Sequence, residues 1–244
     1  MRIVAIIQAR MGSTRLPGKV LLPLQDRTVL GHVINRVRAV PSISEVIVAT
    51  STQVLDDAVE AEALRERALV YRGSEQDVLS RFYEAAVTHA AELVIRITAD
   101  CPLIDPSIIG ATIQRLIDTG ADYASNCLQR TYPRGLDVEV FTMLALQQAF
   151  QWADRPEQRE HVTPFIYQSP DEFKLVHVTH VENFADYRWT LDTEEDWQLI
   201  SHIYSAIHKP GYMFTWEEAL RLCQANPHLL LLNQHIEQKK LGER

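Results

Sequence analysis

Residues 3–24 constrain the fold more than any other stretch, because an apolar segment runs directly into a basic loop that contains glycine. The segment from Ile3 to Ile7 is a nearly continuous β-branched run, which is typical of a strand buried on both faces of a parallel sheet. Ligands of open α/β sheets bind at the carboxyl ends of such strands, where this loop begins. The loop contains Gly12, Ser13, Thr14 and Gly18 and three cations, Arg10, Arg15 and Lys19. This composition predicts a cradle for a polyphosphate.

Physical chemistry explains why a polyphosphate site needs this mixture. Several negative charges lie within a few ångströms of one another, so both backbone N–H donors and fixed cations are required. The loop is not the Walker A motif of P-loop NTPases. Five residues separate Gly12 from Gly18 where that motif has four, and Val20 replaces its magnesium-binding hydroxyl. A solvated basic turn is the alternative interpretation of the loop.

The chain continues as alternating helix and strand patterns. Thr28 is placed to cap a helix to about Ala39, a strand pattern follows at Glu45–Thr50, and a helix and a strand at Leu55–Arg67 and Leu69–Tyr71 repeat the order. This order predicts right-handed parallel crossovers. We therefore expect one α/β domain over residues 1–244, with a Rossmann-like, mostly parallel sheet flanked by helices. A small element at residues 128–180 is expected to project and to support dimerisation.

Two aspartates follow extended segments far apart in the sequence. Asp100 comes after the strand pattern Leu93–Thr98, and Asp192 comes after Arg188–Leu191. Asp192 also precedes Thr193, which is placed to cap a helix to about His208, so its carboxylate is free to project. If both segments enter one sheet in the same sense, both carboxylates reach the edge that carries the basic loop. A carboxylate opposite a polyphosphate cradle can hold Mg²⁺.

The basic loop resembles the signature of a known enzyme family. The run Gln8-Ala-Arg-Met-Gly-Ser-Thr-Arg-Leu-Pro-Gly-Lys19 is similar to that of the CMP-sugar synthetases, the acylneuraminate-type cytidylyltransferases, and is closest to their spore-coat polysaccharide branch. The similarity extends to about Glu237. Ala99-Asp-x-Pro102 and the segment after Leu191 also match, although Cys101 and Glu194 depart from the family pattern; Glu194 stands where the family has proline.

The resemblance implies a GT-A-like nucleotidyltransferase that transfers CMP from CTP to a sugar acid and releases pyrophosphate, in surface polysaccharide biosynthesis. It assigns Mg²⁺ to Asp100 and Asp192, with Arg10 and Lys19 as further catalytic residues. It assigns nucleotide binding to Ala9, Arg10, Gly12, Ser13, Arg15, Lys19, Arg72 and Ser74. For the last two, helix capping by Gly73-Ser74 is the competing interpretation.

A second group of candidates concerns the acceptor. Arg134 follows a Pro-containing turn and is a candidate for an anionic substrate. The resemblance also places Arg159, Glu160 and His161 near the sugar, where an arginine fork suits a carboxylate. A structural role is the alternative for His161. Asp137 and Glu139 share one face of a strand pattern and form either a metal pair or a polar strand edge.

Composition excludes several classes of protein. The net charge of −8 argues against nucleic-acid binding. Three cysteines without paired spacing argue against a disulfide framework or a zinc site. The first apolar run is too short for a signal peptide, and no stretch has membrane-spanning length. We expect a cytoplasmic protein without membrane insertion, forming a homodimer.

Three other functional classes compete with this interpretation. A metal-dependent glycosyltransferase shares the fold class, but Asp100-Cys-Pro lacks the second aspartate of an Asp-x-Asp pair. A uridylyl-type sugar nucleotidyltransferase, which would use UTP and a sugar 1-phosphate, is a second alternative. A non-catalytic nucleotide-binding subunit predicts the loss of Arg10, Lys19, Asp100 or Asp192, and all four are present.

Overall fold

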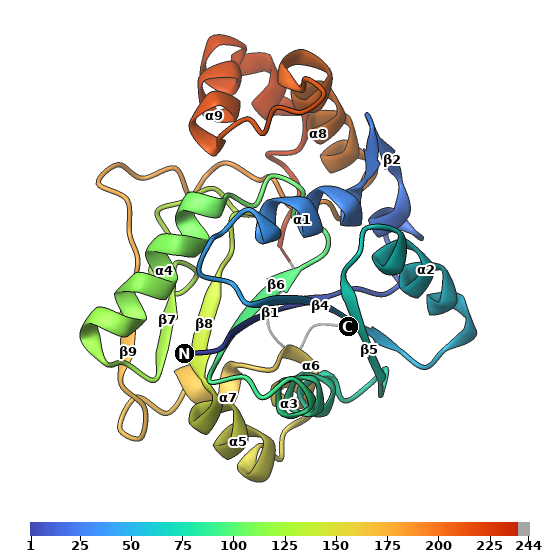
Figure 1. Cartoon of the computed structure of the whole chain (residues 1–244). Coiled ribbons are helices and arrows are strands. Elements are labelled where there is room, and N and C mark those ends of the chain that lie inside the picture. The colour runs from blue at the N-terminus through green and yellow to red at the C-terminus, as the bar shows by residue number, and fades with distance from the viewer. Residues whose placement is uncertain (239–244) are drawn as a thin grey trace.

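The computed structural model describes residues 1–238 and is built on a seven-stranded sheet in the order β5-β4-β1-β6-β8-β7-β9 (Figure 1). The strands of this sheet are β1 (Ile3–Gln8), β4 (Glu45–Ser51), β5 (Leu69–Gly73), β6 (Leu93–Thr98), β7 (Tyr123–Ser125), β8 (Glu139–Thr142) and β9 (Leu175–His177). A separate hairpin is formed by β2 (Pro23–Leu24) and β3 (Arg27–Thr28).

The helices are α1 (Val29–Arg38), α2 (Asp57–Arg65), α3 (Val78–Thr88), α4 (Pro106–Thr119), α5 (Met143–Trp152), α6 (Pro156–His161), α7 (Pro164–Tyr167), α8 (Glu194–Ile207) and α9 (Trp216–Ala225). Three short 3₁₀ turns are η1 (Lys19–Leu21), η2 (Val54–Asp56) and η3 (Pro227–Leu232). None of the helices within residues 1–238 has both the length and the apolar character needed to cross a membrane.

The sheet is mostly parallel, as predicted. Strands β5, β4, β1 and β6 run parallel to one another. Strand β8 pairs antiparallel with both β6 and β7, so β7 and β9 again run in the direction of β6. The carboxyl ends of six of the seven strands therefore lie along one edge, which is where α/β proteins bind ligands.

Each face of the sheet has its own apolar core. Along β1, Ile3, Ala5 and Ile7 belong to the core formed with α1, α2, α4, α8 and α9, whereas Val4 and Ile6 belong to the core formed with α3, α5 and α7. Figure 1 shows α1 and α4 on one side of the sheet and α3, α5, α6 and α7 on the other. A strand buried on both faces explains the unbroken apolar run that begins the sequence.

Most predicted helix starts are confirmed. The predicted caps at Thr28 and Thr193 are present, and Asp105 and Thr215 cap two further helices. The side chain of each accepts a backbone N–H of the first turn of its helix. The predicted cap at Gly73-Ser74 is wrong. Helix α3 begins at Val78 and is capped by Asp77, while Ser74 Oγ accepts from Asp77 N at 3.0 Å and forms a turn before the helix.

Two further expectations need correction. Much of the segment 128–180 does not project, because β8 lies between β6 and β7 inside the sheet, β9 forms its edge, and α6 packs on α3. The segment Arg188–Leu191 does not enter the sheet. It instead forms a parallel bridge to Arg134, and Leu191 N donates to Asp100 O at 2.8 Å.

Candidate active site

The basic loop folds back on itself at the carboxyl end of β1. Ser13 N and Gly18 N both donate to Met11 O, at 2.8 and 3.3 Å. Gly18 has a φ of +70°, a conformation that favours glycine, and it leads directly into η1 and Lys19. The buried carboxylate of Asp56 accepts from Met11 N at 2.7 Å and anchors the loop to the end of β4.

Lys19 joins the two predicted metal-binding aspartates. Its Nζ lies 2.6 Å from Asp100 Oδ2 and 2.5 Å from Asp192 Oδ1. The two carboxylate oxygens are therefore at most about 5 Å apart, the sum of these two distances. The structure thus brings together the three residues around which the predicted site was built. The backbone bond from Leu191 to Asp100 explains how segments so distant in sequence meet.

A set of buried groups fixes the position of Asp192. Asp196 is fully buried and accepts from Asp192 N at 2.9 Å, from the Arg188 guanidinium and from Asn233 Nδ2. Arg15 Nη2 lies 2.8 Å from Asp192 Oδ2, and Arg188 Nη2 lies 3.3 Å from the same oxygen. Asp192 therefore has a defined orientation and three cationic neighbours.

Opposite charges and burial act against each other in the pKa values of this cluster. Burial tends to lower the pKa of Lys19, but the charges and hydrogen bonds of Asp100 and Asp192 outweigh it and raise the pKa. Burial tends to raise the pKa of Asp100, but the charge and hydrogen bond of Lys19 hold it below its usual value. Both groups are therefore charged at neutral pH, as an electrostatic site requires.

One glycine lets the segment carrying Asp192 approach closely. Gly135 has a φ of +103°, and a Cβ added there would lie 2.4 Å from Trp189 C. Trp189 N also donates to Arg134 O at 2.6 Å. Any larger residue at position 135 would therefore push away the backbone that leads to Asp192.

The remaining nucleotide-binding candidates lie in different settings. Ala9 is buried at the end of β1, while Arg10 and Gly12 are exposed on the loop. Arg72 is occupied elsewhere: its guanidinium donates to Ser51 O and Gln53 O and pairs with acidic residues of α2. The structure therefore gives Arg72 a structural role and does not place it with Lys19. Ser74 is exposed, but its hydroxyl is engaged in the turn before α3.

The acceptor candidates do not form one cluster. Arg159 pairs with Asp77 and donates to Phe150 O at 2.8 Å, so it holds the start of α3 and is not free to meet a sugar carboxylate. Glu160 is exposed. His161 lines a cavity of about 230 Å³ with Arg96, Thr98, Tyr123, Asp137 and Glu139. Burial lowers the pKa of His161, which favours the neutral ring.

Glu139 and Asp137 do not form a metal pair. Glu139 is buried and is held by Arg96, by Tyr123 Oη at 2.7 Å and by Thr163. Asp137 is paired with Arg130. Arg134 differs from these, because its side chain makes no ion pair within residues 1–238. Burial lowers the pKa of Arg134, and the nearby Arg130 adds to this effect.

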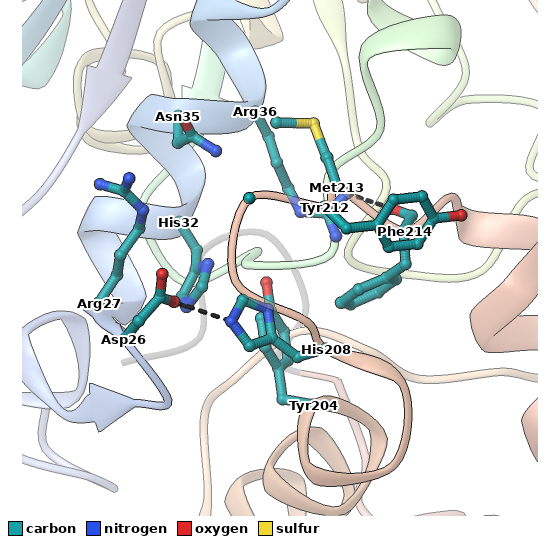
Figure 2. Close-up of a pocket in the computed structure, with 11 residues that line it drawn as sticks. Asp26, Arg27, His32, Asn35, Arg36, Tyr204, His208, Tyr212, Met213 and Phe214 are labelled. Carbon is teal, nitrogen blue, oxygen red and sulfur yellow. Dashed lines mark hydrogen bonds and ion pairs between the residues drawn. The ribbon is translucent and has the colours of Figure 1, made fainter.

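A second cavity of about 260 Å³ lies away from these carboxylates, between α1, the β2–β3 turn and the end of α8 (Figure 2). His208 Nε2 lies 2.9 Å from Asp26 Oδ1, and Arg36 Nη1 donates to Phe214 O at 3.0 Å. His32 Nε2 contacts Leu24 O at 2.7 Å, and burial lowers the pKa of His32 to about 4. These side chains bind one another and tie the hairpin to α8.

The carboxylates fit a magnesium ion that is shared with phosphates. No group of three or more His, Cys, Asp or Glu side chains suited to a metal occurs in the described part of the chain. Asp100 and Asp192 alone would supply two oxygens, and Mg²⁺ usually takes one or two protein carboxylates and completes its shell with water and phosphate oxygens. Lys19 occupies these oxygens here, so binding a metal ion requires its ammonium to move.

Several residues that shape the site were not among the predicted ones. Asp56 was expected inside a helix, although its position just after β4, at the same edge as the loop, was an available signal. Arg188 was predicted only as part of an extended segment, and Asp196 lies inside the helix predicted after Thr193, whereas the structure shows that both position Asp192. No local pattern identifies such long-range partners.

The fold and the site together define a nucleotidyltransferase class of protein, and comparison with known proteins specifies it. Residues 4–240 match the cytidylyltransferase family. The chain is 36% identical over 237 residues to the spore coat polysaccharide biosynthesis protein SpsF of Bacillus subtilis, covering 92% of this chain and 95% of that protein. The chain belongs to the cytidylyltransferase family and is therefore a nucleotidyltransferase enzyme.

Solved structures agree with this assignment. A cytidylyltransferase from Leptospira borgpetersenii superposes with a TM-score of 0.90 at 34% identity, covering 98% of this chain and 100% of that one. CMP:2-keto-3-deoxy-manno-octonic acid synthetase, solved in complex with CTP, superposes with a TM-score of 0.64 at 21% identity over 84% of this chain and 99% of that one. The second similarity concerns the fold alone.

Proposed function

We propose that this enzyme transfers CMP from CTP to a hydroxyl group of a sugar acid and releases pyrophosphate, as a step in glycan biosynthesis. The observation that carries the proposal is the bridge made by Lys19 between Asp100 and Asp192, next to the basic loop. A divalent ion can take the place of the lysine ammonium between the two carboxylates, while the triphosphate that it accompanies binds to the loop. The relatives described above support cytidine as the base.

The chain's own residues would act mainly by positioning and by charge neutralisation. Arg10, Arg15 and Lys19 would bind the β- and γ-phosphates, and the N–H groups of Gly12 and Ser13 would lie close to them. Mg²⁺, when bound by Asp100 and Asp192, would neutralise part of the negative charge on the phosphate oxygens. Asp196 and Arg188 keep Asp192 oriented for that task.

The bond changes follow the usual course of in-line substitution at phosphorus. The acceptor hydroxyl oxygen forms a bond to the α-phosphorus, the bond from that phosphorus to the bridging oxygen breaks, and pyrophosphate leaves with the bonding electrons. The hydroxyl proton passes to solvent. Lys19, once displaced from the aspartates, places its positive charge where the leaving pyrophosphate gains negative charge.

The acceptor is proposed to bind next to Asp100, on the β6–β8 side of the site. The cavity that contains Thr98 and His161 opens there and suits a sugar-sized molecule. Arg134 is the cation best suited to its carboxylate, because Arg134 makes no ion pair within residues 1–238 and lies beside the backbone that leads to Asp192. Arg159 is no longer the preferred partner, because it pairs with Asp77.

The setting of the reaction completes the proposal. We propose that the enzyme is a cytoplasmic homodimer and that magnesium is its working metal. All three cysteines are free thiols, which is consistent with a reducing compartment. Light scattering coupled to size exclusion would measure the mass of the assembly.

The direct test is pyrophosphate release from each of the four nucleoside triphosphates with a panel of sugar acids and Mg²⁺. We expect turnover with CTP and little with ATP, GTP or UTP. The Asp100→Asn variant is the control, and it should lose turnover by orders of magnitude. Turnover with UTP and a sugar 1-phosphate would instead assign the enzyme to the uridylyl class.

A further inference from the structure

Asn233 is a buried amide that joins the C-terminal part of the described chain to the segment that carries Asp192. Asn233 is only 2% exposed. Its Nδ2 donates to Arg188 O and to Asp196 Oδ1, each at 2.8 Å. An amide group has two N–H donors, and both donors of Asn233 are used on residues 188–196. The hydrogen bonds of this buried amide therefore connect two stretches that are far apart in the sequence.

The two acceptors of Asn233 lead to Asp192 by separate routes. Asp196 Oδ1 accepts from Asn233 and from Arg188 Nε, the latter at 2.9 Å. The other oxygen, Asp196 Oδ2, accepts from Asp192 N at 2.9 Å. Holding Oδ1 therefore fixes the direction in which Oδ2 faces. The second route is through the backbone of Arg188, because Arg188 Nη2 lies 3.3 Å from Asp192 Oδ2.

The segment that carries Asn233 is itself anchored. Turn η3 packs against α8 and α9, and Leu229 within it is buried; the red end of the chain lies beside these two helices (Figure 1). Ile236 N donates to Asn233 O at 3.0 Å. The side chain of Gln238 accepts from Arg188 Nη1 at 2.7 Å. The C-terminal segment therefore holds Arg188 at two points, its carbonyl and its guanidinium.

We propose that Asn233 is a positioning residue for nucleotidyl transfer, and that residues 227–238 thereby contribute to the active site. Asn233 acts through Asp196 and Arg188 on the carboxylate of Asp192. The inference rests on the proposed function, in which that carboxylate binds the metal ion that accompanies the triphosphate. A guanidinium released from its anchors would pair with both oxygens of Asp192 and compete with the metal ion. Asn233 prevents this by holding Arg188 and Asp196 in place.

The test compares the wild type with Asn233→Leu, which is similar in size and lacks the amide. Binding of CTP is measured by calorimetry in the absence of an acceptor, once with Mg²⁺ and once with EDTA. In the wild type we expect Mg²⁺ to tighten CTP binding. In Asn233→Leu this metal-dependent gain should be about 10-fold smaller, as expected when a group that orients a metal ligand is removed. The affinity for CTP in EDTA should change less than about twofold.

Asn226→Leu is the matched control. Asn226 is half-buried just before the same segment, and its Nδ2 donates to Leu222 O at 2.9 Å, within α9. This variant also loses one buried side-chain amide, so thermal unfolding of both variants shows the cost to the fold. The metal-dependent gain in CTP affinity should equal that of the wild type in Asn226→Leu.

The two CTP affinities separate positioning from stability. An equal loss with and without Mg²⁺ would assign Asn233 to the stability of the fold and overturn the inference. An unchanged metal-dependent gain in Asn233→Leu would also overturn it and leave the proposed function standing, whereas a wild type that does not bind CTP overturns both. If Asn233→Leu does not fold, Asn233→Ser replaces it, because the shorter side chain stays polar but cannot reach both acceptors. The ratio of the two affinities remains the deciding measurement.

Discussion

Replacing Lys19 by methionine tests whether the lysine holds the place of a divalent cation. The variant removes the ammonium that lies 2.6 Å from Asp100 Oδ2 and 2.5 Å from Asp192 Oδ1, and leaves a side chain of similar length. Two unit charges about 5 Å apart repel by about 3 kcal/mol at an effective dielectric constant of about 20. A divalent ion that binds the variant relieves this repulsion and no longer has to displace an ammonium.

We therefore expect Lys19→Met to bind Mn²⁺, without nucleotide, about 10- to 100-fold more tightly than the wild type, since each 1.4 kcal/mol is tenfold in affinity. Arg15 and Arg188 remain next to Asp192 in the variant. The gain in the free energy of Mn²⁺ binding is therefore smaller than the full repulsion energy between the two carboxylates. Turnover with CTP should fall in the same variant, because the phosphates lose a cation.

The assay is a titration with Mn²⁺ followed by electron paramagnetic resonance of the free ion. Lys209→Met is the matched control, because Lys209 is an exposed lysine on another part of the chain, and its metal affinity should equal that of the wild type. Unchanged or weaker Mn²⁺ binding by Lys19→Met would refute the reasoning that the two aspartates form one cation site.

Three further predictions follow from particular residues. Gly135→Ala should destabilise the fold and reduce turnover, because the added Cβ would lie 2.4 Å from Trp189 C. Gly110→Ala is the control: an added Cβ there meets nothing within 4 Å, and alanine should stabilise α4 by up to about 1 kcal/mol. Urea unfolding measures the stability of both variants. The pKa of His32 in the folded protein is about 4, below its usual value, so His32 is protonated in the unfolded chain at a higher pH than in the folded protein. The free energy of unfolding therefore falls as the pH drops from about 7 toward 4. We expect a loss of about 2 kcal/mol in this free energy between pH 7 and 5, and no such loss in His32→Gln. Asp100→Asn and Asp192→Asn should each cut turnover by orders of magnitude, and the double variant should lose less than the product of both, unless the two carboxylates act independently.

Local sequence rules predicted much of the fold. The unbroken run from Ile3 to Ile7 identified a strand buried on two faces, and the caps at Thr28 and Thr193 marked two helix starts, because these signals depend only on neighbouring residues. The cap before α3 was misplaced, since Ser74 and Asp77 are both good capping residues and only the geometry of the turn selects Asp77.

The sequence predicted the residues that meet at the centre of the site, but not the contacts that bring them together. Lys19, Asp100 and Asp192 meet as expected, but the segment before Asp192 reaches Asp100 through a backbone bond outside the sheet, which strand patterns cannot reveal. The roles of Arg72 and Arg159 depended on acidic partners elsewhere in the fold, Glu60 and Asp77. Such pairings lie beyond the reach of local patterns.

The most direct measurement of the central claim is the ³¹P NMR spectrum of a reaction that contains the enzyme, CTP, Mg²⁺ and an accepted sugar acid. We expect the triphosphate signals to be replaced by one phosphodiester signal of a CMP-sugar and by an equal amount of pyrophosphate. The Asp192→Asn variant should leave the CTP spectrum unchanged. A diphosphate-linked nucleotide sugar, or release of inorganic phosphate in place of pyrophosphate, would contradict CMP transfer by this enzyme.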